Sequence, residues 1–295
     1  MISFEEIVCE KDKEKRDLLI KEKLFELNET SPKVTIDTNS IMTGFISKES
    51  TVMFSAFHYD LNMGLGSLYG MREDDYFYEF FDFLNAHNIT TKEQAIMFIS
   101  SFLKLYFDEQ GKKEVDRELL FDDICNQLDN MSDDVERFNR CKESWLDIGI
   151  FKNRSAAECT EHSCVAQNLL TFCDVDCCYV SGHMKTNTSN EDHAYNIIKL
   201  NDKYYLLDST NPYNLYDSND NYAGCKSYFF EVSKEQLENL FKNKGEIVFP
   251  KCNFMKTPNG TTIKVDQSTN VYTTSCKFLD KDSMNEFLES DNKKL

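Results

Sequence analysis

The sequence predicts an α+β protein, because helical and strand patterns occupy separate parts of the chain. Between about residues 74 and 150 the apolar residues recur at helix spacing, whereas after residue 176 the runs are typical of β-strands. A length of 295 residues with 41% hydrophobic residues allows a substantial core. We expect a mainly helical N-terminal lobe over residues 1–140, a core over 141–250, and a C-terminal β-hairpin and tail over 251–295.

Two helices are predicted from stripes of aromatic and aliphatic residues. The first runs from Asp74 to Leu84, and the second runs from Ala95 to Phe107 after a capping box made by Thr91 and Gln94. A third helical stretch is expected from about Val115 to Asp147. The stripe residues that should be buried are Phe77, Phe80, Phe81, Leu84, Ile99, Phe102, Leu103 and Tyr106.

Strands are predicted in the second half of the chain. Their ranges are Cys177–Met184, Asp192–Asn201, Lys203–Thr210 and Ser227–Val232. Ser233 and Gln236 then form a capping box before a short helix over Leu237–Phe241, which Gly245 ends. The turn signal Pro258-Asn259-Gly260, between runs rich in Thr, Val and Tyr, predicts a late hairpin.

The charge balance narrows the possible partners. With 33 Lys and Arg against 51 Asp and Glu, the formal net charge is -18, so the surface repels a phosphate backbone and nucleic acid is not expected. Residues 1–16 lack the apolar segment of a secretory signal, and no stretch approaches a membrane span. Eleven cysteines, an odd number, favour reduced thiols and a cytoplasmic location, with export by a signal-independent route left open. The sequence carries no signal for an oligomeric state.

Cys159 is predicted to lie in the first turn of a helix. Ser155 and Glu158 have the spacing of a capping box, with Ser155 as N-cap, and an apolar helix follows through residues 165–170. The helix dipole and the unpaired N–H groups there favour an anion, which lowers the pKa of a thiol and offers donors to an oxyanion. Cysteines are also common in cores, so position alone does not single out Cys159.

His193 and Asp208 are predicted to be neighbours across a hairpin. A two-residue loop at Asn201-Asp202 pairs residues whose numbers sum to 403, so His193 faces Thr210 and Asp208 faces Tyr195. The two side chains then lie diagonally on one face, whereas a three-residue loop would put them on opposite faces. A carboxylate beside a histidine fixes its tautomer and stabilises the imidazolium that forms when a thiol loses its proton.

These residues resemble the transglutaminase-like superfamily of papain-fold acyl-transfer enzymes and cysteine peptidases, over about residues 158–212. The family pattern is a Cys that opens a helix, a Tyr-Val-Ser-Gly strand, a His-Ala-aromatic strand and a Leu-Asp-x-Thr strand. The matching segments are Cys159–Ser163, Tyr179–Gly182, His193–Tyr195 and Leu207–Thr210. The resemblance implies a papain-like core over residues 141–250, in which a nucleophile helix packs on an antiparallel sheet. It assigns the roles of nucleophile, base and orienting acid to Cys159, His193 and Asp208.

The reaction that the resemblance implies is thiolate attack on an amide carbonyl to give a thioester, without cofactor or metal. Water would then make the protein a peptidase or deamidase, and an amine would make it a transglutaminase. The expected substrate is a peptide or protein amide. Acidic residues expected around the site favour a cationic or amine-bearing substrate or simply form a solvated surface; they are Glu158, Glu161, Asp174, Asp176, Glu191 and Asp192. The alternative function is a non-catalytic domain of the same fold that binds a partner.

Rival assignments in the same segments are weaker. Zinc would need ligands among Cys164, Cys173, Cys177, Cys178, His162 and His183, but no CxxC pair occurs. Cys164 and His162 lie on other helix faces than Cys159, so they are a poor nucleophile and a poor base. Taken singly, His193 could be a surface histidine and Asp208 the start of a turn.

Three further sequence features each have a functional and an ordinary structural interpretation. Trp145 is one candidate for a second oxyanion donor, although a lone tryptophan on a helix is more often core. Glu161 gives the Cys-x-Glu motif of the related arylamine N-acetyltransferases, without their Arg-Gly-Gly lead-in. The glycine-rich segment 64–70 lacks the Lys and Ser or Thr of a phosphate-binding loop and is expected to be an ordinary loop.

Overall fold

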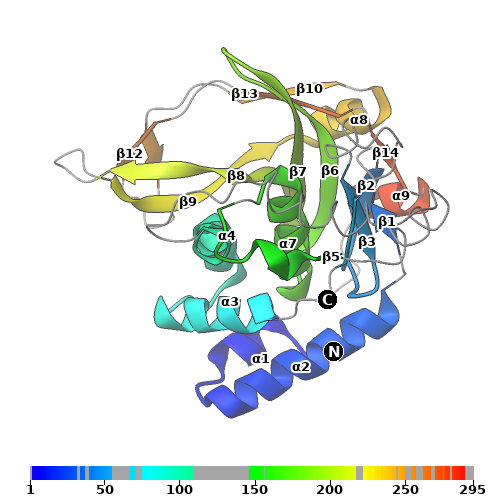
Figure 1. The fold of residues 1–295 in the computed structure, drawn as a ribbon. Helices are drawn as coiled ribbons and strands as arrows, with labels where there is room; N and C mark the ends of the chain where they lie inside the picture. The colour runs from blue at the N-terminus through cyan, green and yellow to red at the C-terminus, as the bar shows by residue number, and fades with distance from the viewer. Residues whose placement is uncertain are drawn as a thin grey trace, which may run out of the picture.

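A computed structural model of the chain describes residues 2–31, 34–36, 40–54, 67–70, 75–108, 146–155, 157–216, 222–243, 245–249, 254–256, 262–266, 270–274, 276–279 and 281–289. These residues form an α+β fold in which helices cover a large, mostly antiparallel sheet (Figure 1). Within the described ranges, every helix is too short or too polar to cross a lipid bilayer.

Helices at the start of the chain form the outer layer. They are α1 (Phe4–Cys9), α2 (Lys13–Thr30) and α3 (Asp75–Ala86), and α4 (Lys92–Phe107) lies between them and the sheet (Figure 1). The two predicted helices are thus confirmed as α3 and α4. The predicted capping box is only half formed: the Thr91 hydroxyl accepts from the N–H of Gln94 at 3.3 Å, but the Gln94 side chain accepts from Thr90 instead of Thr91.

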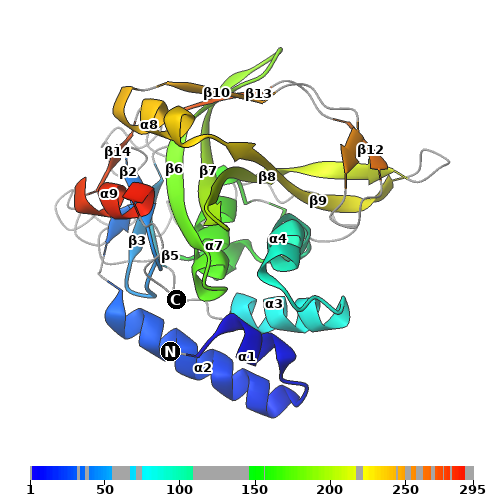
Figure 2. The same cartoon turned by 180° about the vertical axis from the view of Figure 1, so that it is seen from behind.

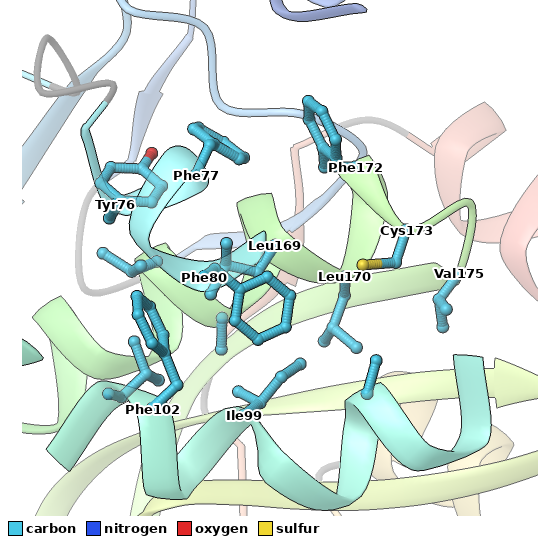
Figure 3. Close-up of a cluster of buried hydrophobic side chains, with 14 of the residues drawn as sticks. Tyr76, Phe77, Phe80, Ile99, Phe102, Leu169, Leu170, Phe172, Cys173 and Val175 are labelled. Carbon is cyan, nitrogen blue, oxygen red and sulfur yellow. The ribbon is translucent and has the colours of Figure 1, made fainter. Parts of the chain in front are cut away.

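The aromatic stripes of α3 and α4 meet α7 (Cys159–Phe172) in one core (Figure 3). Phe77 and Phe81 contact the ring of Phe172, with centroids 5.0 and 5.4 Å apart, and Phe80 lies 5.0 Å from Phe102. All eight stripe residues predicted to be core are buried. The C-terminal half of α7 is therefore held by close apolar packing.

The large sheet contains all four predicted strands, each longer than expected, although β7 ends at Leu200 instead of Asn201. They are β6 (Asp176–Lys185), β7 (Asn190–Leu200), β8 (Lys203–Tyr216) and β9 (Tyr222–Val232). The main strand order is β10-β13-β6-β7-β8-β12-β11, with β9 paired to β8 (Figures 1 and 2). The added strands are β10 (Glu246–Phe249), β11 (Phe254–Lys256), β12 (Thr262–Asp266) and β13 (Asn270–Thr273).

The turn between β7 and β8 is the two-residue loop that the sequence predicts. Asn201 and Asp202 have φ values of 51° and 59°, which only short polar residues and glycine adopt readily. The ladder runs from Leu200 opposite Lys203 to Asn196 opposite Leu207, so each pair sums to 403. The predicted register is therefore confirmed over these five pairs, which stop one pair short of Tyr195 and Asp208.

The N-terminal part contains strands that the sequence analysis did not predict. A smaller sheet has the order β1-β3-β4-β5, formed by β1 (Thr35–Ile36), β3 (Thr51–Phe54), β4 (Ser67–Gly70) and β5 (Leu146–Asp147). The expectation of a loop was thus wrong for Ser67–Gly70. The helix expected from about Val115 to Asp147 is wrong at its end, because Leu146 and Asp147 form β5, which a 3-10 helix over Ile148–Phe151 follows. Residues 115–145 lie outside the described ranges.

Two distant segments complete the large sheet beside β6. From the N-terminal part, β2 (Ser40–Thr43) pairs antiparallel with β6 and parallel with β14 (Lys277–Phe278). From the C-terminal part, β13 pairs antiparallel with β6 and β10. The sheet that carries the candidate site therefore draws strands from all three expected parts of the chain.

The C-terminal part follows the prediction in some elements only. α8 (Lys234–Asn243) has the predicted capping box, with both bonds between Ser233 and Gln236 formed. The late hairpin is formed by β11 and β12, which flank residues 258–260, themselves outside the described ranges. The final helix α9 (Lys281–Glu289) was not predicted.

Candidate active site

Cys159 is the first residue of α7 and is partly exposed. The prediction that Ser155 caps this helix is wrong, because Glu158 is the N-cap and the Glu161 carboxylate accepts from the Glu158 N–H at 2.8 Å. Ser155 has a φ of 50°, and its N–H donates to the carbonyl of Phe107 at the end of α4. Cys159 nevertheless lies in the first turn of the helix, as predicted.

Buried amide side chains fix α7 against its neighbours. Asn168 exchanges two hydrogen bonds with the backbone of Ile46, at 2.7 and 2.9 Å. Asn196 of β7 donates to the carbonyl of Ser163 at 3.1 Å and to the side chain of Gln167 at 3.2 Å. These bonds between buried groups set the position of the first turn of α7 relative to the strand that carries His193.

His193 and Asp208 meet as the hairpin register predicts. Nε2 of His193 lies 3.0 Å from Oδ2 of Asp208, and both side chains are buried. The Cys159 side chain lies near the His193 ring and is one of the groups that raise the pKa of His193. Because Nε2 is engaged with Asp208, Nδ1 is the ring nitrogen left to face the sulfur. Cys159, His193 and Asp208 are thus neighbours in this order.

His193 and Asp208 stabilise each other's charged forms. Burial alone lowers the pKa of His193, but the charge and hydrogen bond of Asp208, together with Cys159, raise that pKa to about 10. Burial raises the pKa of Asp208, but His193, Asn211 and Tyr272 outweigh it and lower that pKa to about 2. At neutral pH the pair is therefore an imidazolium beside a carboxylate.

Asp208 is held by more groups than the sequence analysis foresaw. Its Oδ1 accepts from the backbone N–H groups of Thr210 and Asn211, both at 3.1 Å. Its Oδ2 accepts from the Asn211 side chain at 3.0 Å and from the Tyr272 hydroxyl at 2.7 Å. The loop at Asp208 that the rival interpretation expected is thus present as a local bulge in β8, and it is part of what holds the carboxylate. The contact of Asn211 could have been predicted from its position three residues after Asp208. The contact of Tyr272 could not, because nothing in the sequence near Tyr272 indicates it.

The rival groups in the same segments lie buried, except His183, whose side chain is 46% exposed. His162 packs on the ring of Phe107, and burial lowers its pKa to about 4 although Asp208 and a hydrogen bond to the Ser209 backbone oppose this. Burial raises the pKa of the Cys164 thiol. In the part of the chain that the structure describes, no three His, Cys, Asp or Glu side chains are grouped so as to hold a metal ion. Trp145 lies outside the described residues.

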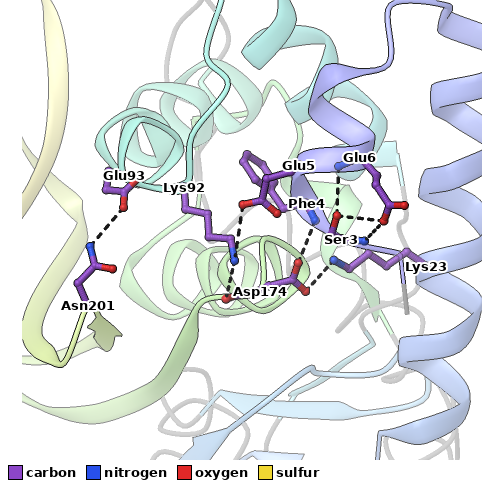
Figure 4. A network of polar contacts seen from close by, with 9 residues as sticks. All are labelled: Ser3, Phe4, Glu5, Glu6, Lys23, Lys92, Glu93, Asp174 and Asn201. Carbon is purple, nitrogen blue, oxygen red and sulfur yellow. Dashed lines mark hydrogen bonds and ion pairs between the residues drawn. The ribbon is translucent and has the colours of Figure 1, made fainter. Parts of the chain in front are cut away.

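The acidic residues are less concentrated around the site than expected. Asp174 lies at the other end of α7, roughly 20 Å away at helical rise, where it accepts from Lys23 at 2.8 Å and from the Phe4 N–H at 2.9 Å (Figure 4). Asp176 begins β6 beside it, and Glu161 is fully buried. The exposed acidic residues adjacent in sequence to Cys159 or His193 are Glu158, Glu191 and Asp192.

A hollow of about 290 Å³ lies near the end of the β6–β7 ladder. It is lined by His183, Lys185, Asn190, Glu246, Val271 and Thr273. Because side chains alternate along β6, β7 and β13, these residues lie on the face of the sheet opposite to the side chains of His193 and Tyr272.

Comparisons with known proteins add no family assignment. No model of a known protein family matches the sequence, and a search of curated proteins found no match. The resemblance to the transglutaminase-like superfamily therefore stays a prediction from the four quoted segments, beside the geometry described above.

Proposed function

We propose that this protein is a thiol-dependent enzyme that transfers or hydrolyses acyl groups at amide bonds, with a papain-like core of the transglutaminase-like type. The observation that carries the proposal is the hydrogen bond of His193 to the buried carboxylate of Asp208, with the partly exposed Cys159 beside the His193 ring. A nucleophile, a proton carrier and an orienting acid in this order are what acyl transfer by a thiolate needs.

In the proposed reaction the proton already resides on His193 before the substrate binds. The thiolate of Cys159 attacks the amide carbon, a C–S bond forms, and the oxygen becomes an oxyanion. The backbone N–H groups of Cys159 and Thr160, at the start of α7, are the donors that the oxyanion would meet. When the C–N bond breaks, the leaving amine takes the proton from Nδ1 of His193 and a thioester remains.

The second half restores the enzyme. His193 is now neutral and accepts a proton from water or from an amine, which attacks the thioester carbon. The C–S bond breaks, the thiolate returns, and the product is a carboxylic acid or a new amide. The hydrolase and transferase types share every step except the identity of this second nucleophile.

The substrate class that fits is a peptide or protein amide with polar neighbours. The preference for cationic substrates expected from the sequence is supported by the exposed acids near Cys159 and His193, which are Glu158, Glu191 and Asp192. Polar peptides are therefore the first substrates to test.

A trapping experiment tests the proposal and separates it from a binding-only domain. The protein is incubated with a library of peptide amides and esters, and acyl adducts are located by mass spectrometry. The expected result is an adduct on Cys159 that hydroxylamine releases and that is absent in Cys159→Ser, with Cys164→Ala as a matched control that keeps it. Binding of a library member without any adduct on Cys159 would favour the binding domain. Added primary amines then separate hydrolysis from transfer.

A further inference from the structure

Asp208 receives one hydrogen bond from a segment that lies far away in the chain. Thr210 and Asn211 are its neighbours, and His193 lies on the paired strand, but Tyr272 belongs to β13, 64 residues further on. The Tyr272 hydroxyl makes the shortest of these bonds, 2.7 Å, to Oδ2, the same oxygen that holds Nε2 of His193. A carboxylate only accepts, so the hydroxyl donates.

Resting on the function proposed above, we infer that Tyr272 is a positioning residue of the triad, which holds the Asp208 carboxylate in the orientation that keeps His193 directed at Cys159.

The surroundings of Tyr272 fix its hydroxyl at this point. Tyr272 is fully buried, its ring lies 5.3 Å from the ring of Tyr195 in an edge-on arrangement, and Asn270 donates to its hydroxyl at 3.4 Å. β13 can approach because Gly182 has no side chain: a Cβ there would lie 1.9 Å from the Thr273 carbonyl oxygen. A ring packed on several sides cannot swing away, so its hydroxyl constrains the carboxylate.

The chemistry of a buried carboxylate explains why such a donor matters. Asp208 is fully shielded from water, so its charge depends on hydrogen bonds from the protein. A neutral hydroxyl supplies one without adding a positive charge that would compete with His193 for the carboxylate. Without it, Oδ2 is held less firmly and can turn away from Nε2 of His193, so the imidazolium and the thiolate of the proposed mechanism are both less stabilised.

The titratable groups around Asp208 come from four elements. They are His193 from β7, His162 from α7, Tyr272 from β13, and Tyr228 of β9, which pairs directly opposite Asp208. Cys159 of α7 completes the set through His193. His162 has a pKa lowered to about 4 by burial, so it stays neutral above pH 5, where the measurements are made.

The test is the pH dependence of iodoacetamide alkylation at Cys159 between pH 5 and 8, followed by mass mapping, with the exposed Cys9 as internal reference. Tyr272→Phe should move the midpoint toward higher pH by up to about one unit, a loss of up to about tenfold in rate on the acid side. Tyr195→Phe is the matched control: it removes a buried hydroxyl from the same aromatic pair, bonded to the Thr273 carbonyl at 3.2 Å instead of to Asp208. Its midpoint should not move.

A second comparison shows whether Tyr272 acts through Asp208. In an Asp208→Asn background, Tyr272→Phe should cause no further shift. The inference is overturned if Tyr272→Phe leaves the midpoint in place, if Tyr195→Phe shifts it equally, or if the shift persists without the Asp208 charge. If instead Cys159 in the unaltered protein reacts no faster than Cys9 and does not depend on His193, it is the proposed function that fails.

Discussion

Gly182 and Thr273 approach so closely that no other residue fits at position 182. A Cβ at Gly182 would lie 1.9 Å from the Thr273 carbonyl oxygen, and a backbone atom cannot give way as a side chain can. Gly182 belongs to β6 and also pairs with His193 of β7. β6 therefore lies between β7 and β13, the strand that carries Tyr272. This close approach explains why the Tyr-Val-Ser-Gly segment has a glycine at position 182.

Gly182→Ala should displace β13 and weaken both stability and reactivity. We expect a loss of about 2 kcal/mol in the free energy of unfolding, typical of overpacking in a tight site. Urea unfolding measures the first effect, and the rate of Cys159 alkylation measures the second. Gly44→Ala is a useful control, because nothing lies within 4 Å of a Cβ at Gly44 and only its positive φ of 80° is strained; it should lower stability without slowing alkylation.

The His193–Asp208 pair should give stability a defined pH window. The pKa of His193 is raised to about 10, so its contribution is complete below about 6.5 and is lost as pH rises toward 10. The pKa of Asp208 is lowered to about 2, so its contribution is present above about 3.8 and is lost as pH falls toward 2. The difference in unfolding free energy between the unaltered protein and His193→Gln should therefore be largest between about pH 4 and 6.5. A difference that grows from pH 7 to 10 would contradict the pairing.

His162 should destabilise the protein in acid. Its pKa falls from 6.5 to about 4 because of burial, so it is neutral in the folded protein, and stability is lost as pH falls from 6.5 toward 4. The shift corresponds to about 3 kcal/mol. His162→Gln should flatten the pH dependence of the unfolding free energy over that range. An unchanged slope would show that His162 is not kept neutral.

Removing Asp174 from the Lys23–Asp174 ion pair should lower the stability of the protein more than removing Lys23 (Figure 4). The Lys23 side chain is fully buried, whereas that of Asp174 is 29% exposed. Asp174→Asn tolerates the positive φ of 55° but leaves the Lys23 charge without its carboxylate, at a cost of about 3 kcal/mol. Lys23→Met leaves a carboxylate that water reaches, at a cost of about 1 kcal/mol. Thermal or urea unfolding of both variants tests the order, and the alkylation rate of Cys159 should not change in either.

The sequence predicted those parts of the site that depend on local rules. The parity of the Asn201-Asp202 turn placed His193 and Asp208 on one face, and Cys159 was placed at a helix start from the spacing of Ser155 and Glu158 before an apolar helix. The N-cap was misassigned, because Ser155 is drawn into a bond with the Phe107 carbonyl of α4, a contact that local spacing does not reveal.

What the sequence did not predict depends on pairing between distant segments. β2 and β13 join β6 from opposite ends of the chain, and neither pairing has a turn that would fix its register. Tyr272 was therefore missed, although it contacts Asp208, because it lies in the expected C-terminal tail, outside the core expected over residues 141–250. The site as the structure has it includes a residue beyond that core.

The most direct measurement is the alkylation of Cys159 by iodoacetamide as a function of pH, mapped by mass spectrometry, in the unaltered protein and in His193→Ala. An imidazolium at His193 predicts that Cys159 reacts at least about tenfold faster than Cys9 below neutral pH and that His193→Ala abolishes this advantage. Equal reactivity of the two thiols at pH 6, or an advantage of Cys159 that survives the loss of His193, would contradict the account.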